Sequence, residues 1–301
     1  MAKTDSEPYV YTYTYDKTGV RFENGCYYEI NVKMKKEPID LSRVDASFTA
    51  VDGDVLTGKL GMHKVTIADK ATVTLRNADI SHTEYPEWST SDMCRYAGLN
   101  LEGGATIVLE GTNKVSGFHQ NYPGIYIPAN ATLYIQGSES LEARSGGRAA
   151  GIGGTYGEEF ETAVDNESGN IIFQGSPTIT AWGGYHAAGI GSSEKNKCGE
   201  IIINGGTITA YGGEGAAGIG SGYQGICTDM MLWSGTITAF GGTDAPGIGS
   251  GSYGQCGNIA SPTWETITAH SGSEGIPDVG AGLHGSCGEI SGRDASSSGS
   301  A

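Results

Sequence analysis

The chain has 301 residues, of which 50 are glycine and nine are proline, and 34 acidic residues against 18 basic ones give a formal net charge of −16. Glycine at this level without a Gly-X-Y period excludes collagen and indicates many tight turns. So acidic a chain repels phosphate backbones and anionic membrane surfaces, and no nucleic-acid partner is expected.

Residues 1–50 are predicted to form a separate β element. Aromatic or apolar residues alternate with polar ones in Tyr9–Tyr15 and Tyr27–Met34, which is the period of a half-buried strand. Strands of this kind can cap the open end of a larger β structure, whose edge would otherwise aggregate. Met1–Ser6 contains no apolar signal core. No stretch approaches the ~18 apolar residues of a membrane span, so no membrane insertion is expected.

A repeat of about 29 residues dominates the chain from residue 147 to residue 287. A Gly-Ile-Gly block begins at Gly151, Gly189, Gly218 and Gly247. The tetrapeptide Thr-Ile-Thr-Ala recurs at spacings of 29, 29 and 30 residues, beginning at Thr178, Thr207, Thr236 and Thr266. A repeat of this length indicates stacked structural units, each of which contacts only its neighbours.

Each repeat has the composition of one coil of a right-handed parallel β-helix, an all-β solenoid. Runs of four or five residues rich in β-branched side chains are bounded by glycine pairs, and helical spacing is absent. Three short strands and three turns fit into ~29 residues, and coils would stack at ~4.8 Å. The strand period places Ile208 and Ala210 inward and Thr207, Thr209 and Tyr211 outward. The Gly-Ile-Gly glycines are explained by a crowded corner with positive φ rather than by ligand binding.

Less regular strands extend the predicted β-helix toward the N-terminus, at 71–75, 105–109 and 131–135. Near the other end, Pro262 interrupts the expected strand, because proline cannot donate a ladder hydrogen bond. The chain is therefore divided into three regions. These are an N-terminal β element or cap (1–50), the parallel β-helix (51–290) and a flexible tail rich in serine and glycine (291–301).

Leu56–Leu60, Val65–Asp69, Gly124–Pro128 and the Ala-Gly-Ile-Gly and Gly-Gly-Thr-Ile-Thr-Ala repeats resemble β-helix regions of bacterial cell-surface proteins. Such regions accompany fimbrillin-like and adhesin modules and are similar to carbohydrate-binding β-helix modules. The resemblance covers residues 40 to 290. It implies an exported, extracellular or cell-surface protein whose leader lies outside this sequence, and it implies adhesion or contact with glycans.

Two outward aromatic files are the candidate ligand-binding residues. The first follows Thr-Ile-Thr-Ala and contains Trp182, Tyr211 and Phe240, then His270. The second follows the Gly-Ile-Gly corner and contains Tyr156, Tyr223 and Tyr253, with Glu194 and His284 in corresponding places. Stacked rings suit the C–H faces of sugars, but they also stabilise coils without binding anything. Trp182 and Tyr211 are the strongest candidates.

The threonines of the repeated Thr-x-Thr strands form a further outward array. A flat threonine array on a solenoid is also compatible with the ordering of water by an ice-binding protein. Threonine is, however, simply a favoured strand residue.

Four cysteines also recur once per coil: Cys198, Cys227, Cys256 and Cys287, with Ser168 in the preceding slot. Stacked coils bring them within disulfide range, but parallel side chains in register point the same way. Buried free thiols are therefore favoured over disulfides. Zinc is disfavoured because no Cys-x-x-Cys pair or nearby histidine completes a site.

No catalytic residue is assigned from the sequence. Glycoside hydrolysis needs two carboxyl groups about 5–9.5 Å apart, and no Asp-Asp, Asn-Thr-Asp or Arg-x-Lys motif is present. No cofactor is expected. Calcium binding at the acidic surface, for example near Asp52 and Asp54, is retained as an alternative, although no EF-hand loop occurs.

The expected function is that of a non-catalytic surface β-helix that acts in adhesion or binds a polysaccharide or cell-surface glycan. A polysaccharide lyase or glycoside hydrolase of the β-helix type is the main alternative. A phage tail spike or a structural spacer is the further one. The sequence leaves the ligand and the oligomeric state open.

Overall fold

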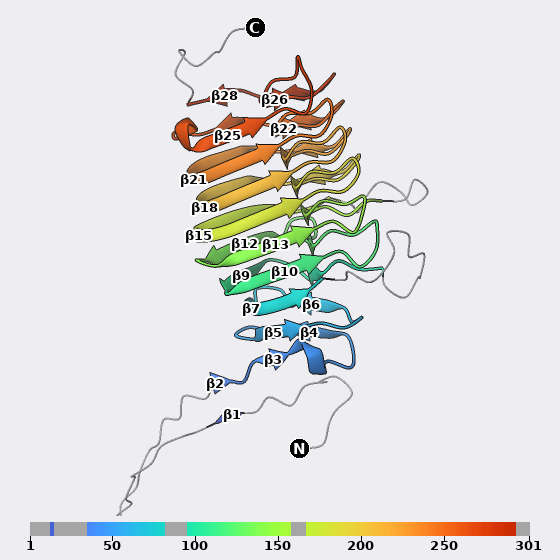
Figure 1. The fold of residues 1–301 in the computed structure, drawn as a ribbon, viewed down its shortest axis with the longest axis vertical. Helices are drawn as coiled ribbons and strands as arrows, with labels where there is room; N and C mark the ends of the chain where they lie inside the picture. The colour runs from blue at the N-terminus through green and yellow to red at the C-terminus, as the bar shows by residue number, and fades with distance from the viewer. Residues whose placement is uncertain (1–12, 15–34, 82–94, 158–166, 293–301) are drawn as a thin grey trace, which may run out of the picture.

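A computed structural model describes residues 13–14, 35–81, 95–157 and 167–292. In these residues the chain is a parallel β-helix, as predicted, and its coils stack into an elongated solenoid (Figure 1). Strands of successive coils pair in parallel. β1 (Tyr13–Thr14) and β2 (Lys35–Lys36) form a separate antiparallel pair.

The largest sheet has thirteen strands and contains the longest strand of each regular coil. Its strands are β3 (Ile39–Asp40), β5 (Val55–Lys59), β7 (Thr72–Ile80), β9 (Ala105–Glu110), β10 (Thr112–Ser116), β12 (Thr132–Gly137), β13 (Ser140–Arg144), β15 (Asn170–Trp182), β18 (Ile201–Tyr211), β21 (Met230–Phe240), β24 (Ile259–Ala260), β25 (Ile267–His270) and β28 (Ile290–Ser291).

Two smaller parallel sheets complete the coils. The nine-stranded sheet contains β4 (Phe48–Ala50), β6 (Val65–Ile67), β8 (Leu99–Leu101), β11 (Ile125–Tyr126), β14 (Ile152–Gly153), β16 (Ile190–Gly191), β19 (Ile219–Gly220), β22 (Ile248–Ser250) and β26 (Val279–Ala281). The four-stranded sheet contains β17 (Lys197–Cys198), β20 (Ile226–Cys227), β23 (Gln255–Cys256) and β27 (Ser286–Cys287).

A glycine corner divides β15, β18 and β21 into a first and a second half. Gly175, Gly205 and Gly235 mark this corner, and all three have positive φ. The repeat then fixes the register of the second half, where Thr207 lies level with Thr178 and Thr236. Each long strand therefore presents two outward faces, one on each side of its corner.

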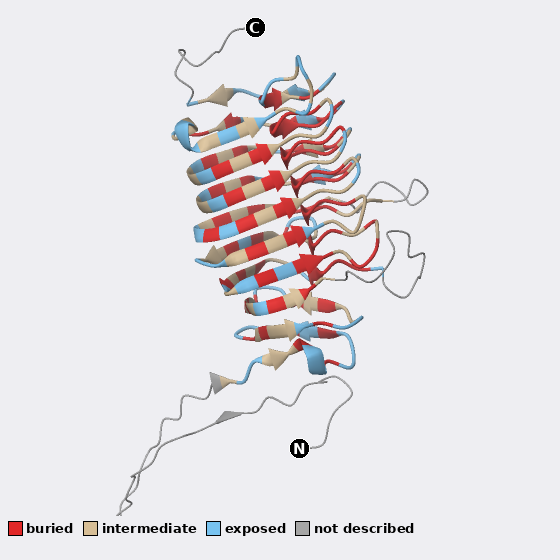
Figure 2. Cartoon of the chain, in the orientation of Figure 1, coloured by how far each residue is buried: buried red, intermediate tan, exposed pale blue. Residues whose placement is uncertain are grey.

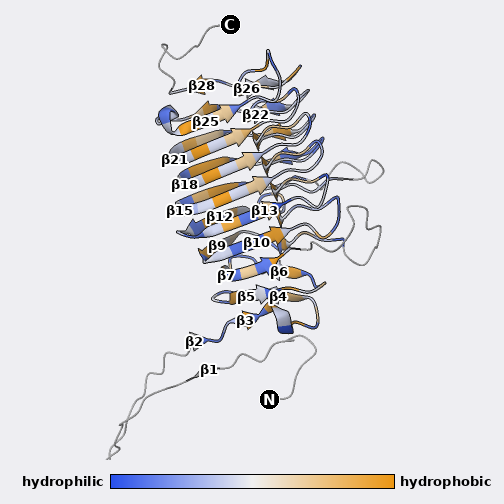
Figure 3. Ribbon diagram, in the orientation of Figure 1, coloured by the Kyte–Doolittle hydropathy of each residue, from blue (hydrophilic) through white to orange (hydrophobic). Residues whose placement is uncertain are grey.

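The interior is lined by the residues that the strand period predicts. Ile208, Ala210 and the corner residue Ile219 are fully buried, whereas Thr209 and Tyr211 are partly exposed. Figure 2 shows buried and more exposed residues alternating along the long strands, and Figure 3 shows the matching change in hydropathy. The core is consequently a column along the solenoid axis rather than a single central cluster.

The solenoid begins earlier than the predicted boundary at residue 51. β3 pairs with β5 and β4 pairs with β6, so both strands belong to the parallel sheets. Between them lies the 3₁₀ helix η1 (Leu41–Arg43). Hydrogen bonds from the Ser42 hydroxyl and backbone N–H hold the pKa of the Asp40 carboxyl below its ordinary value. Most of the strands predicted within 9–34 lie outside the described residues.

The irregular coils follow the sequence analysis. The strands predicted at 71–75, 105–109 and 131–135 correspond to β7, β9 and β12 and pair with one another. After Ala260, Pro262 ends the strand, and the 3₁₀ helix η3 (Trp264–Thr266) replaces the expected continuation. The last strand reaches Ser291, at the start of the predicted tail, and residues 293–301 lie outside the described part.

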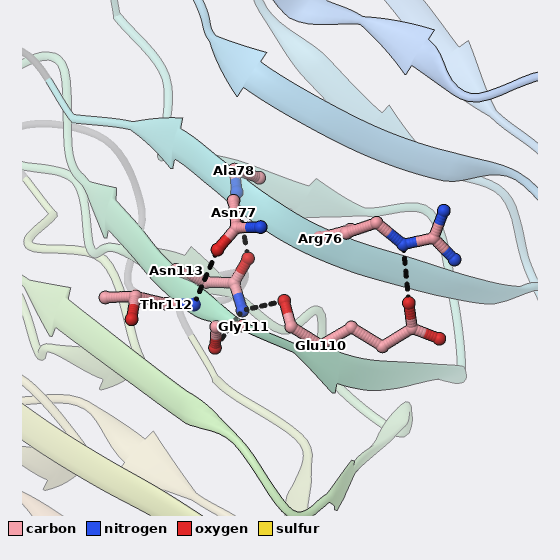
Figure 4. A network of polar contacts seen from close by, with 7 residues as sticks. All are labelled: Arg76, Asn77, Ala78, Glu110, Gly111, Thr112 and Asn113. Carbon is pink, nitrogen blue, oxygen red and sulfur yellow. Dashed lines mark hydrogen bonds and ion pairs between the residues drawn. The ribbon is translucent and has the colours of Figure 1, made fainter.

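Asparagine side chains tie the irregular coils together where the repeat is weak. The buried side chain of Asn113 accepts a hydrogen bond from the Ala78 N–H at 2.9 Å and donates to the Glu110 carbonyl at 3.2 Å. Asn77 accepts from the Thr112 N–H at 3.0 Å. Figure 4 shows this network between β7 and β10. The register of β7 shifts at Asn77, so nearby backbone groups lose their regular partners in the neighbouring strand. The asparagine side chains supply hydrogen bonds to these groups instead.

The state of the cysteines corrects the sequence-based expectation of free thiols. Cys198 is bonded to Cys227 and Cys256 to Cys287, with Cα–Cα distances of 4.7 and 4.5 Å. Both distances fall within the usual range for a disulfide. Rotation about the Cα–Cβ bonds brings neighbouring sulfur atoms together although the Cα–Cβ bonds run parallel. Ser168 occupies the preceding slot, as predicted.

Peptide mapping without reductant should recover the Cys198–Cys227 and Cys256–Cys287 linkages. Each bridge closes a loop of about 30 residues, so reduction should lower the free energy of unfolding by about 3–4 kcal/mol per bridge. Chemical denaturation with and without reductant measures this change. Quantitative alkylation of all four thiols in the unreduced, unfolded protein would contradict the pairing.

Gly220→Ala should destabilise the solenoid by at least ~3 kcal/mol. Gly220 has a φ of 129°, and an added Cβ would overlap the carbonyl oxygen of Gly249 in the next coil. Gly53→Ala is the matched control, because its φ is also positive but no atom lies within 4 Å. We expect only backbone strain of about 1–2 kcal/mol there. Equal losses in a denaturation experiment would argue against backbone crowding.

Candidate functional site

The first aromatic file forms a continuous ladder at the end of the second strand halves, here called the strand-end ladder. Trp182 and Tyr211 stack with centroids 5.6 Å apart and an interplanar angle of 7°. Tyr211 and Phe240 stack at 4.9 Å and 5°, and Phe240 and His270 at 4.9 Å and 15°. Arg144 extends the ladder by one coil, because its guanidinium lies 3.6 Å from the centroid of Trp182.

This stacking determines what the ladder can offer a ligand. Nearly parallel rings at these distances cover much of each other's faces. Arg144 also covers the outer face of Trp182. Trp182, Tyr211 and Phe240 are each only partly exposed. The ladder therefore presents mainly ring edges to solvent. Its stacking stabilises the coils and requires no ligand to account for it.

Threonine columns lie on the same face as the ladder. Thr178, Thr207 and Thr236 form one outward column. Thr180, Thr209, Thr238 and Thr268 form a second. Thr266 does not join the first column, because it lies in η3. The result is a regular array of hydroxyl groups bordered by aromatic rings.

A second aromatic group lies in the loops and corners that follow the ladder, and we call it the corner cluster. It consists of Tyr185, His186, Tyr223 and Tyr253 together with Glu194. The His186 ring is held between Tyr185, at 3.9 Å and 22°, and Tyr223, at 4.6 Å and 23°. Tyr223 meets Tyr253 edge to face at 5.7 Å and 69°. Tyr185 is 47% exposed and Tyr253 51% exposed, so these two rings face solvent.

A polar pair is built into the corner cluster. His186 Nδ1 lies 3.2 Å from Glu194 Oε2, and the two side chains are 17% and 9% exposed. Lys195 Nζ lies 3.7 Å from the other oxygen of Glu194. When His186 is neutral, a hydrogen bond from Nδ1–H to the carboxylate leaves Nε2 as an acceptor. The cluster thus combines solvent-facing rings with a fixed carboxylate and imidazole.

The second predicted file is only partly realised. Backbone hydrogen bonds place Gln224, not Tyr223, level with Tyr253: the N–H of Gln224 donates to the carbonyl of Ser252. The offset between the two coils is constant, so Ser252 occupies the position of Tyr223 and Tyr253 lies one position further along, which explains its edge-to-face contact with Tyr223. Tyr253 continues to His284 at 4.9 Å. Tyr156 lies beneath the Arg148 guanidinium, 4.2 Å from the ring centroid.

Tyr185 and His186 were missed by the sequence analysis. The corresponding positions in the following coils are Glu214–Gly215 and Thr243–Asp244, so no periodic aromatic signal marks them. Gly215 also leaves the space that Tyr223 occupies, since an added Cβ would lie 2.9 Å from its ring. The one feature of the sequence that could have indicated them is a pair of adjacent aromatic residues in a glycine-rich loop.

The described residues contain neither a cluster of metal-ligating side chains nor a membrane-spanning helix. No group of three or more histidine, cysteine, aspartate or glutamate side chains in this part of the chain is arranged to hold a metal ion. No helix in the same residues is long and apolar enough to cross a membrane.

Comparison with known families supports the fold. The family model of the beta helix repeat matches residues 175–194, 201–223 and 233–252. The matched segments contain three members of the strand-end ladder and most of the corner cluster. Neither the curated proteins nor the solved structures contain a significant match to the chain.

Tyr211→Ala should reduce stability by about 1–3 kcal/mol, because it removes two stacking contacts from the middle of the ladder. Thr209→Ala is the matched control, two residues earlier on the same outward face, and should change stability by no more than ~0.5 kcal/mol. Urea denaturation of the two variants measures both effects. Equal losses would show that the ladder adds nothing beyond ordinary strand packing.

Proposed function

We propose that this chain is a non-catalytic, extracellular β-helix that binds a polysaccharide or cell-surface glycan and acts in adhesion. The corner cluster carries this proposal. Tyr185 and Tyr253 are about half exposed, and the His186–Glu194 pair is fixed beside them. Aromatic surfaces with a few fixed polar groups are the usual composition of sites that bind small polar ligands.

The chemistry of the cluster suits a sugar ring. The apolar C–H face of a pyranose packs on an aromatic ring, as Tyr185 would allow. Sugar hydroxyl groups can donate to Glu194 and to the acceptor nitrogen of His186. The threonine columns and the edges of Trp182 and Tyr211 then provide a longer surface along which further sugar units of a linear chain can lie.

The disulfides support the extracellular part of the proposal. Disulfides form and persist in oxidising environments and are rare in the cytosol. Two bridges staple successive coils of this solenoid. An extracellular location would maintain them, and resistance to unfolding is useful on a surface exposed to shear.

A glycan array followed by titration calorimetry tests the proposal. We expect binding of a polysaccharide with a dissociation constant in the micromolar-to-millimolar range, corresponding to about 4–8 kcal/mol. Tyr185→Ala combined with Tyr253→Ala should weaken it at least ~10-fold. Met62→Ala is the control, because Met62 is a 39% exposed large side chain outside both aromatic groups.

The outcomes of this test separate the alternatives. Absence of any glycan ligand, or binding that survives the double substitution, would overturn the proposal and favour a passive spacer or spike. If the glycan also contacts the strand-end ladder, Trp182→Ala combined with Tyr211→Ala should weaken its binding in the same titration. Release of reducing ends or unsaturated products from the bound polysaccharide would instead establish a glycoside hydrolase or lyase.

A further inference from the structure

The first halves of the long strands present an outward surface that the proposed function does not use. Tyr134, Ile172, Ile202 and Met231 lie level with one another on β12, β15, β18 and β21. They form an outward column of four successive coils. Tyr134 is 36% exposed and the other three are partly exposed. Large apolar side chains of this kind are normally found inside proteins.

The column lies within a wider uncharged surface. Six successive coils each contribute two outward residues, which are the first and third of a three-residue segment. None of these residues is acidic or basic. The segments are 72–74, 106–108, 134–136, 172–174, 202–204 and 231–233. We call this surface the neutral face. Trp233, 47% exposed, stands on it because a register shift inserts one residue into β21. At its border, Arg76 and Glu110 neutralise each other at 2.5 Å.

The kind of side chain that it exposes makes this neutral face unusual. The formal net charge is −16, and residues 198–292 contain eight acidic side chains and no lysine or arginine, so copies that meet through the acidic loops would repel each other. The threonine columns on the second strand halves are also uncharged, but they present hydroxyl groups, whereas the neutral face presents large apolar side chains. Contiguous exposed apolar surface on a soluble protein marks an interaction site.

We propose that the neutral face is the interface of a homodimer, in which it packs against the same face of a second copy. A second copy meets two requirements at once. It presents an uncharged surface to an uncharged surface. It also repeats its side chains at the same ~4.8 Å interval, so columns of the two copies can interdigitate over several coils. The self-complementary arrangement is that of a twofold axis.

The size of the face sets the expected strength of the dimer. Two outward columns, each taking two residues of strand at ~3.3 Å per residue, are ~13 Å wide, and six coils at ~4.8 Å span ~29 Å. The flat area is therefore about 400 Å² per copy, or about 800 Å² when both copies are counted. Interfaces of this size are weak or transient. A dissociation constant in the micromolar range is expected.

Sedimentation velocity of the full chain from ~1 to ~300 µM tests the proposal. The mass should rise from 31.2 kDa toward twice that value as concentration increases. Ile202→Lys combined with Met231→Lys should raise the dissociation constant at least ~30-fold, because it places like charges opposite each other. Thr209→Lys is the matched control: it adds the same charge to an outward position of β18, but on the second half, and should leave the dimer intact.

Two further measurements guard against misfolding and indirect effects. Ile202→Thr keeps a β-branched residue and adds no charge, and should weaken the dimer by a few-fold with an unchanged circular dichroism spectrum. Added salt should strengthen the dimer by screening repulsion from Glu200 and Asp229, which precede Ile202 and Met231 by two residues and border the face on its other side. A wild-type chain that stays monomeric over the whole range, a dimer that survives the double lysine substitution, or one that Thr209→Lys disrupts equally would each overturn the proposal.

Discussion

The structure depends on one constraint, which is that each coil must place its backbone N–H groups opposite the carbonyl groups of the next coil. In a parallel sheet these hydrogen bonds are evenly spaced, so equivalent residues of successive coils lie at one level. Thr178, Thr207 and Thr236 show the result. A side chain that is stable at one position is thereby repeated along the axis, whether it is buried or exposed.

The same constraint explains why two kinds of aromatic contact occur in one molecule. Trp182, Tyr211 and Phe240 occupy equivalent positions, and their rings are forced into a stack. Tyr223 and Tyr253 differ by one position, and they meet edge to face. Regular repetition therefore buries ring faces and stabilises the solenoid. Departures from repetition, as at Tyr185 and Tyr253, leave rings exposed and available for recognition.

The repeat made the regular coils predictable, because its period directly specifies which residues are equivalent. The inward positions of Ile208 and Ala210, the corner residue Ile219 and the order of the strand-end ladder all followed from it. Arg144 was not foreseen as part of the ladder because its coil lacks the repeated tetrapeptide. Tyr185 and His186 occur once only. Their proximity to Glu194 depends on a loop conformation, in which His186 has a φ of 62°, and no periodicity encodes it.

The start of the solenoid and the cysteine pairing required three-dimensional information of a different kind. β3 and β4 are strands of two and three residues, too short for alternation to be recognised. For the cysteines, the sequence correctly placed four residues in one inward column. The choice between thiols and disulfides depends on side-chain torsion, which spacing does not specify.

The pairing of the cysteines in twos has a mechanical consequence. Cys227 and Cys256 lie level with each other, yet each is bonded to the cysteine on its other side. Apart from the backbone that connects them, these two coils are therefore held together without a covalent cross-link, whereas the boundaries on either side are each crossed by a disulfide. A solenoid pulled from its ends would part first at such a joint. Each bridge would then withhold about 100 Å of extended chain, at ~3.4 Å per residue, from the applied force.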